Sequence, residues 1–174
     1  MDIKKISIGK DAPNDINVII EVPMNSDPIK YEFNKESGAI EVDRFIATPM
    51  YYPCNYGFVP HTLSDDGDPI DVLVVSDYAI NPGCVINAKP IGVLIMEDEK
   101  GMDEKIIAVP GKKLNSAYED IDDLSELPKG LIDKISHFFE RYKDLEKNKW
   151  VKIKEFGNKQ QAIKLINEAI SRKS

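Results

Sequence analysis

The pattern of apolar and polar residues divides the chain into a first part rich in strand signals and a second part rich in helix signals. Short apolar or alternating runs at residues 16–22, 29–33 and 39–46 are separated by turns that contain proline, asparagine or glycine. We predict three strands there, which form an antiparallel meander. Residues 50–60 are aromatic and punctuated by proline and glycine, which is typical of a shaped loop and an edge strand.

The central part of the chain continues in extended structure. The apolar run at residues 70–75 is dominated by β-branched side chains, which predicts a buried strand. Residues 85–97 predict a long extended segment. A hairpin turn at residues 97–103 and a return strand at residues 105–109 follow.

After residue 127 the apolar spacing changes to that of a helix. Apolar residues recur at helical intervals from 128 to 147, and Pro128 stands near the first helical position. A short strand is expected at residues 150–156, and Gly157-Asn158 opens a final amphipathic helix. We therefore expect one domain over residues 1–174, of α+β class, in which two helices pack against a small closed antiparallel β-barrel similar to the OB fold.

Composition narrows the class of protein further. The apolar content of 42% and the charged content of 30% are ordinary for a soluble globular protein. A formal charge of −7 argues against nucleic acid as the main partner. The chain has no apolar stretch near the roughly 20 residues of a membrane helix and no signal-peptide core, so we expect a cytoplasmic protein without a membrane partner. Cys54 and Cys84 form no disulfide framework and are expected to be structural.

An acidic turn directly precedes the buried strand at residues 70–75. Four of its residues carry carboxylates: Asp65, Asp66, Asp68 and Asp71. Carboxylates held this close raise each other's pKa unless a cation neutralises them, and oxygen-rich sites suit hard divalent cations such as Mg²⁺. A solvated acidic turn is the alternative. A calcium-binding EF-hand loop is excluded, because the sixth position from Asp66 is not glycine and a strand follows.

Other charged and phenolic residues stand at predicted strand and helix positions. They are Lys30, Arg44, Asp98, Asp103, Lys105, Tyr142 and Lys143. Metal-assisted phosphoryl chemistry needs this mixture, because carboxylates bind the metals whereas cations and phenols bind phosphate oxygens. The chain has no glycine-rich P-loop, so a nucleotide is not the obvious substrate. Each residue taken alone is better explained as a solvated charge or a core aromatic.

Several segments of the chain resemble soluble inorganic pyrophosphatases of the first family, in its bacterial form. The resemblance rests on Asp66-Gly67-Asp68-Pro69-Ile70-Asp71, Ile20-Glu21-Val22-Pro23, Asp27-Pro28-Ile29-Lys30-Tyr31-Glu32, Val42-Asp43-Arg44, Tyr52-Pro53-Cys54-Asn55-Tyr56-Gly57, Asp98, Asp103, Lys105, His137-Phe138-Phe139-Glu140 and Tyr142-Lys143. These segments occur in the family's order and span residues 10–157, nearly the whole chain.

The resemblance implies an activity and a set of roles. The expected reaction is Mg²⁺-dependent hydrolysis of inorganic diphosphate to two phosphates, by in-line attack of a metal-activated water. The implied metal ligands are Asp66, Asp71, Asp98 and Asp103; the implied base is Asp68, helped by a nearby tyrosine; and the implied substrate-binding residues are Lys30, Arg44, Tyr56, Lys105, Tyr142 and Lys143. Glu21 and Glu32 are expected to form an acidic rim, and the family's bacterial members imply a homohexamer.

Some residues depart from the family pattern or stand outside it. Asp65 is an acid where many relatives have an apolar residue, and Arg141 replaces a second histidine of some bacterial relatives, which puts a pH-dependent helix contact between subunits in doubt. His137 is expected to be a packing or interface residue. Lys4, Lys35 and Lys173 are expected to be solvated.

Two other functions are compatible with parts of the sequence. A nucleic-acid-binding barrel needs a basic groove with exposed aromatics, which the clustered aspartates oppose. A metal-dependent hydrolase of an organic phosphate fits the cations, but the chain leaves little room for a base or sugar pocket.

Overall fold

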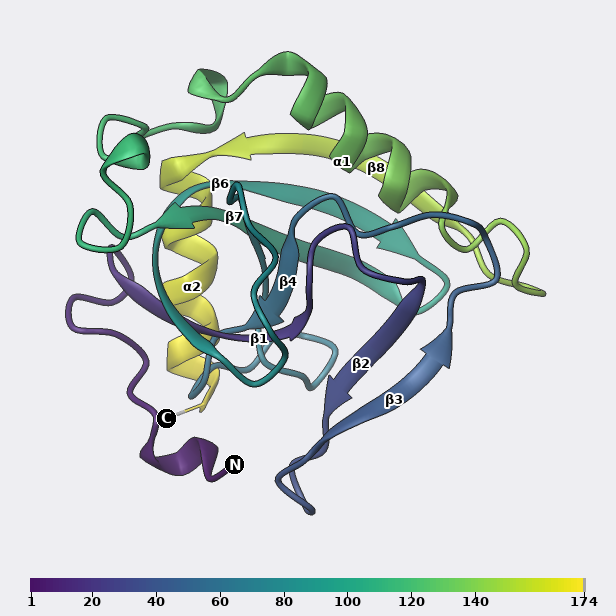
Figure 1. Cartoon of the computed structure of the whole chain (residues 1–174), viewed down its shortest axis with the longest axis horizontal. Coiled ribbons are helices and arrows are strands. Elements are labelled where there is room, and N and C mark those ends of the chain that lie inside the picture. Colours follow the sequence, from purple (N-terminus) through teal and green to yellow (C-terminus); the bar gives the residue numbers. More distant parts are fainter. Residues whose placement is uncertain (174) are drawn as a thin grey trace.

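The computed structural model describes residues 1–173, which form a curved sheet with a helix on each side and a separate hairpin (Figure 1). The strands are β1 (Ile16–Val22), β2 (Ile29–Phe33), β3 (Ile40–Phe45), β4 (Asn55–Phe58), β5 (Asp71–Val74), β6 (Val85–Asp98), β7 (Gly101–Pro110) and β8 (Val151–Asn158). The helices are α1 (Lys129–Arg141) and α2 (Lys159–Lys173), with short 3₁₀ turns η1 (Ile3–Lys5), η2 (Ser116–Tyr118) and η3 (Leu124–Glu126). The last residue of the expected domain, Ser174, lies outside the described residues.

The main sheet is barrel-like and mixed in strand direction. Its strand order is β1-β4-β5-β7-β6-β8, and β1 also pairs with β6. The α+β class and the two helices packed on a barrel-like sheet are confirmed, and the β1–β6 pair joins the two ends of the strand order β1-β4-β5-β7-β6. Only the prediction of wholly antiparallel pairing needs correction. The β5–β7 pair is parallel, and β8 pairs only with β6 at an edge. The parallel pair escaped prediction because the chain returns through a long strand, β6, and not through a crossover helix.

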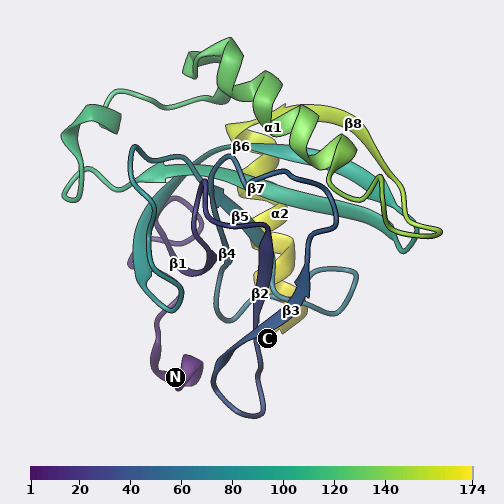
Figure 2. The ribbon, with the colours of Figure 1, turned by 45° about the vertical axis from the view of Figure 1, so that its right-hand side comes forward.

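The strands nearest the N-terminus also differ from the predicted meander. β2 and β3 pair only with each other (Figure 2), and Phe33 of β2 packs against Phe58 of the main sheet with ring centroids 5.9 Å apart. β4 is not an edge strand, since it lies between β1 and β5 and all its residues are buried. Gly57 permits the close approach to β1, because a Cβ atom there would lie 2.0 Å from the Ile19 carbonyl oxygen.

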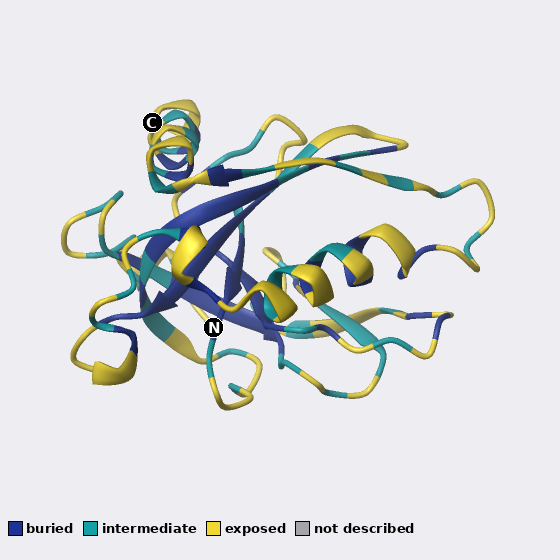
Figure 3. Ribbon diagram, turned by 90° about the horizontal axis from the view of Figure 1, so that it is seen from above, coloured by how far each residue is buried: buried dark blue, intermediate teal, exposed yellow. Residues whose placement is uncertain are grey.

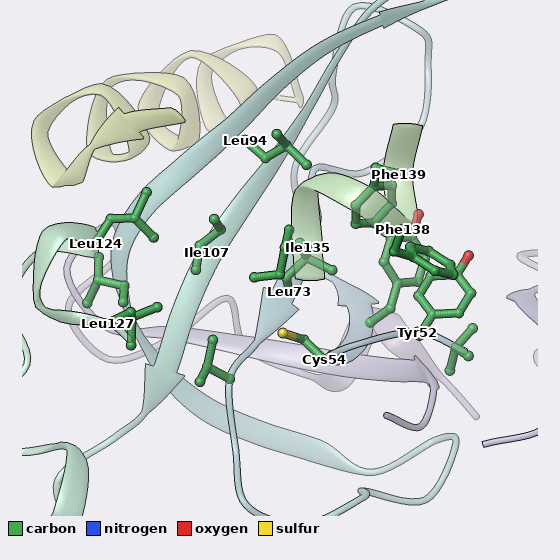
Figure 4. Packing of buried hydrophobic residues seen from close by; sticks show 14 of the residues in the cluster. Tyr52, Cys54, Leu73, Leu94, Ile107, Leu124, Leu127, Ile135, Phe138 and Phe139 are labelled. Carbon is green, nitrogen blue, oxygen red and sulfur yellow. The ribbon is translucent and has the colours of Figure 1, made fainter. Parts of the chain in front are cut away.

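The inner strands are apolar on both faces because a helix covers each face. On β5, Val72 and Val74 belong to the core beneath α2, whereas Leu73 belongs to the core beneath α1. On β7, Ile107 lies close to Leu73 in the same α1-side core (Figure 4). This two-sided burial explains the continuous apolar run that predicted the strand. The outward surfaces of both helices are exposed (Figure 3).

The first helix is shorter than its sequence pattern predicts. It ends at Arg141, with Tyr142 as its C-cap, and Leu145 is 66% exposed. Residues 142–148 instead form turns and a bend, and Lys143 and Lys149 from this stretch and its end line a cavity described below. The second helix begins where predicted. The Gln161 N–H donates to Asn158 Oδ1 at 3.1 Å, and the Asn158 N–H donates to Gln161 Oε1 at 2.9 Å, as in a capping box.

Neither α1 nor α2 is long and apolar enough to cross a membrane, which holds for the part of the chain that the structure describes.

Candidate active site

A cavity of about 230 Å³ opens between the β2–β3 hairpin, the β6–β7 hairpin and the turns that follow α1. Its charged lining is almost balanced, with eight carboxylates and seven cations. The carboxylates are Glu21, Glu32, Asp66, Asp68, Asp71, Asp98, Glu99 and Asp103, and the cations are Lys30, Lys35, Arg44, Lys100, Lys105, Lys143 and Lys149. Tyr52, Tyr56, Phe139 and Tyr142 supply aromatic walls. The cavity is therefore suited to a small, highly charged ligand.

The acidic turn presents its carboxylates from a tightly bonded backbone. The Ser64 N–H donates to the Asp68 carbonyl at 2.7 Å, and the Gly67 N–H donates to the Ser64 carbonyl at 3.1 Å. Gly67 has a φ of +91°, which favours glycine at this point of the turn. The Asp66 carboxylate accepts the Asp68 N–H at 3.0 Å, and Asp71 follows as the first residue of β5. The loop thus fixes the spacing between the acids.

Lys105 lies between two of the carboxylates at the centre of the cavity. Its Nζ is 2.7 Å from Asp71 Oδ2 and 2.9 Å from Asp103 Oδ1, and its side chain is 4% exposed. Burial alone would lower the pKa of the Lys105 ammonium, but the two aspartates outweigh burial and raise the pKa well above its ordinary value. Burial raises the pKa of Asp71, against the effect of Lys105. The parallel β5–β7 register places Lys105 directly opposite Asp71.

Aromatic packing positions the residues that follow α1. Phe138 stacks on Tyr142 with ring centroids 5.1 Å apart, and Tyr52 packs on Phe138 at 4.6 Å. The Tyr142 carbonyl accepts a hydrogen bond from Thr48 at 3.2 Å. Lys143 therefore enters the cavity from a fixed backbone, and its Nζ lies 2.7 Å from Asp98 Oδ2.

A chain of ion pairs connects the β2–β3 hairpin to the turns after α1. Lys30 contacts Asp43 at 3.1 Å, and Asp43 contacts Arg44 at 2.8 Å. Arg44 Nε lies 3.4 Å from Glu146 Oε1, and both atoms are buried without a hydrogen bond. Glu146 in turn contacts Lys149 at 3.5 Å. The cations at this side of the cavity are thus held in place by carboxylates behind them.

Glu21 lies inside the cavity wall and not at an acidic rim. Its side chain is 6% exposed as part of β1, and its Oε1 accepts the Phe33 N–H at 2.7 Å. Burial raises the pKa of Glu21 to about 8, although that hydrogen bond acts in the opposite direction. Glu32, by contrast, is exposed as predicted for a rim residue.

We expect Glu21→Gln to change how stability depends on pH in protein freed of metals by a chelator. Glutamate in an unfolded chain has a pKa near 4.3, so the unfolded state releases this proton between about pH 4.5 and 8 while the folded state retains it. Stability of the wild type should therefore fall across this range, at about 1.4 kcal/mol per pKa unit. The difference between the melting temperatures at pH 5 and pH 8 should be smaller in Glu21→Gln than in the wild type. In the exposed control Glu32→Gln this difference should stay as in the wild type. Equal pH slopes in all three proteins would contradict the burial argument.

The structure brings together all the residues that the sequence singled out for the site. Each of the eleven lines the one cavity: Lys30, Arg44, Tyr56, Asp66, Asp68, Asp71, Asp98, Asp103, Lys105, Tyr142 and Lys143. Their individual roles stay predictions. Asp65 lies outside the cavity lining and contacts Arg172 of α2 at 3.0 Å. Arg141 and His137 are exposed on α1.

The sequence interpretation missed several cavity residues. Lys35 was expected to be solvated and is exposed, but its Nζ also lies 2.8 Å from Asp68 Oδ1. Tyr52, Phe139 and Lys149 also line the cavity. Tyr52 and Phe139 were visible as part of matching segments, whereas nothing in the sequence pattern distinguishes Lys35 or Lys149 from other surface lysines.

The carboxylates of the cavity fit a divalent metal by chemistry. Asp66, Asp71, Asp98 and Asp103 supply the oxygen ligands that Mg²⁺ prefers. Within residues 1–173, no three acidic, histidine or cysteine side chains are already grouped as a metal cluster. Lysine ammonium groups contact Asp71, Asp98 and Asp103 instead. These three carboxylates thus already have cationic partners.

A cavity that combines carboxylates with lysine and arginine side chains suits an enzyme that acts on phosphate groups with divalent metals. A family model described as inorganic pyrophosphatase matches residues 18–174. The chain belongs to the inorganic pyrophosphatase family.

Individual relatives agree with this assignment over the full length. The inorganic pyrophosphatase of Brucella melitensis is 60% identical over 172 residues, covering 99% of this chain and 98% of the relative. That of Rickettsia typhi is 62% identical over 172 residues, covering 99% and 96%. Among solved structures, the inorganic pyrophosphatase of Coxiella burnetii has a TM-score of 0.94 at 50% identity, covering 97% of this chain and 100% of that one. The Thermus thermophilus enzyme has a TM-score of 0.94 at 39% identity, covering 99% of each chain.

Proposed function

We propose that this protein hydrolyses inorganic diphosphate to two phosphates and uses Mg²⁺ as its cofactor. The observation that carries the proposal is the convergence of carboxylates, cations and tyrosines around one small cavity, in a chain that belongs to the inorganic pyrophosphatase family. Bound Mg²⁺ supplies positive charge and lowers the pKa of water. Asp66, Asp71, Asp98 and Asp103 are the residues that would hold it.

The chain's own cations and acids supply the remaining chemistry. Arg44 offers a planar guanidinium that can bind two phosphate oxygens, and Lys30 and Lys143 add point charges for the others. Asp68 stands on the acidic turn with its carboxylate 63% exposed at the cavity, where it can accept a proton from the attacking water.

The size of the cavity favours diphosphate over an organic phosphate. Its volume of about 230 Å³ is below the roughly 300–1,000 Å³ of typical small-molecule sites. Fifteen of the residues that line the cavity are charged, which suits phosphate groups better than a base or a sugar. A nucleic-acid groove is also disfavoured, because the carboxylates of the lining offset its cations and leave no basic patch.

Phosphate release from diphosphate, measured with and without Mg²⁺, tests this function. We expect rapid release only with Mg²⁺, and much slower release from ATP under the same conditions. Preference for ATP would favour the organic-phosphate alternative, and absence of release from either substrate would contradict the proposal. Binding of single-stranded nucleic acid at low salt is a separate measurement, in which we expect no binding.

We expect Asp71→Asn to raise the Mg²⁺ concentration needed for half-maximal activity sharply. Asp71 is fixed at the start of β5 beside Asp103 and Lys105, so its loss removes a ligand that no flexible side chain replaces. The matched control is Asp65→Asn, which removes a carboxylate from the same segment but outside the cavity. Equal Mg²⁺ titrations of the two variants would show that Asp71 is not the ligand.

The family resemblance also supports proposals about assembly and location. We propose a homohexamer in the cytoplasm, as the bacterial branch implies. A molar mass about six times the chain's 19.6 kDa, measured by light scattering on a size-exclusion column, would support the hexamer.

A further inference from the structure

The turn of the β2–β3 hairpin holds its shape without help from the Lys35 side chain. The Asn34 Oδ1 atom accepts the Glu36 N–H at 2.8 Å and the Ser37 N–H at 3.0 Å. The Gly38 N–H donates to the Asn34 carbonyl at 2.9 Å, and Gly38 has a φ of +71°. The turn is therefore formed without the Lys35 side chain, and the Lys35 ammonium group is available for a contact elsewhere.

That ammonium group reaches across the mouth of the cavity to the proposed base. Lys35 Nζ lies 2.8 Å from Asp68 Oδ1, and the two side chains are 51% and 63% exposed. Within residues 1–173, no other side chain forms a hydrogen bond or ion pair with the Asp68 carboxylate. The cations Lys105 and Lys143 contact Asp71 and Asp98 instead.

We propose that Lys35 is a positioning residue that fixes the orientation of the Asp68 carboxylate for proton transfer. This inference rests on the proposed function, in which Asp68 is the base. A carboxylate with this exposure has rotational freedom, and holding a reacting group in one geometry raises its rate. Because Lys35 donates to one carboxylate oxygen, Oδ1, the other oxygen stays available for the proton.

Two other roles for Lys35 lead to different expectations. A lysine that bound diphosphate directly would affect KM as well as kcat, and its effect would persist when Asp68 was changed. A lysine that only stabilised the hairpin would affect the melting temperature and would not depend on Asp68. Positioning acts through Asp68 alone, so the effects of the two residues on kcat should not be additive.

A double-mutant cycle on the full-length protein separates these roles. Steady-state diphosphate hydrolysis at saturating Mg²⁺ is measured for Lys35→Ala, Lys35→Arg, Asp68→Asn and the Lys35→Ala/Asp68→Asn pair. We expect Lys35→Ala to lower kcat by up to about five-fold, the upper range for an exposed ion pair, with KM unchanged. Lys35→Arg should restore most of kcat, since arginine can also donate to a carboxylate. In the Asp68→Asn background, Lys35→Ala should have no further effect.

The matched control is Lys134→Ala, which removes the same charge from the exposed side of α1, away from the cavity. Equal kcat in Lys35→Ala and Lys134→Ala would overturn the proposal. So would a change in KM alone, or the same fall in kcat with and without Asp68. A wild-type protein that released no phosphate from diphosphate would overturn the proposed function as well, which distinguishes that failure from a failure of the Lys35 assignment alone.

Discussion

Asp68→Asn is expected to lose about 10²–10⁴-fold in turnover, the usual contribution of a general base. Asparagine keeps the size of the side chain and can still accept a hydrogen bond from Lys35, but it cannot take up the proton. The backbone of the acidic turn should be unchanged, because its hydrogen bonds use the Ser64 and Gly67 N–H groups and the Asp66 side chain. The measurement is kcat for diphosphate at saturating Mg²⁺.

The control for this variant is Asp65→Asn in the same turn. Asp65 contacts Arg172 and does not line the cavity, so its loss should leave kcat within a few-fold of the wild type. Circular dichroism should give the same folded spectrum for both variants. An Asp68→Asn enzyme within a few-fold of wild type would place the base elsewhere.

Arg44→Lys is expected to lower kcat/KM by about ten- to a hundred-fold although it conserves charge. Lysine cannot reproduce the planar fork that binds two phosphate oxygens. The expected loss is about 1.5–3 kcal/mol, the range for a hydrogen bond to a charged group, at 1.36 kcal/mol for each factor of ten.

Lys134→Ala is the charge control for Arg44→Lys. Lys35 is unsuitable as a control, since it contacts Asp68. If removal of an exposed charge on α1 lowered kcat/KM as much as Arg44→Lys, long-range charge would be the cause, and the phosphate-binding role of Arg44 would be wrong.

The sequence predicted most of the strands because their signals are local. The apolar run of β5 follows from burial of both its faces, and the alternation in β2 follows from burial of one face. Both patterns can be read directly from the order of apolar and polar residues. The helix α2 was placed well for the same reason, since Gly157-Asn158 and the apolar spacing mark its start. Ten of the eleven site residues stood out as charged or phenolic residues at predicted turn, strand and helix positions, and Tyr56 entered only with the family resemblance. That they belong to one site followed from the ordered resemblance, because periodicity says nothing about which charges meet in space.

The features that escaped prediction depend on contacts between distant parts of the chain. The central place of β4 follows from its pairing with β1 and β5, which a short aromatic segment does not reveal. Leu145 fits the helical pattern, but α1 ends earlier, because the turns after it carry Lys143 to Asp98. Lys35 meets Asp68 only because the β2–β3 turn lies over the acidic turn, 33 residues further along the chain.

The parallel pairing of β5 with β7 has a consequence for how the enzyme gains activity during folding. Asp71 and Lys105 are opposite each other in this pairing but 34 residues apart in sequence. Strand pairs with such long separations form slowly, because loop closure must precede the contacts that stabilise them. A slip of one residue would also turn Lys105 to the opposite face of the sheet. Recovery of catalysis after dilution from denaturant should therefore lag behind recovery of helical signal, since the catalytic cavity is completed only when this non-local register is correct.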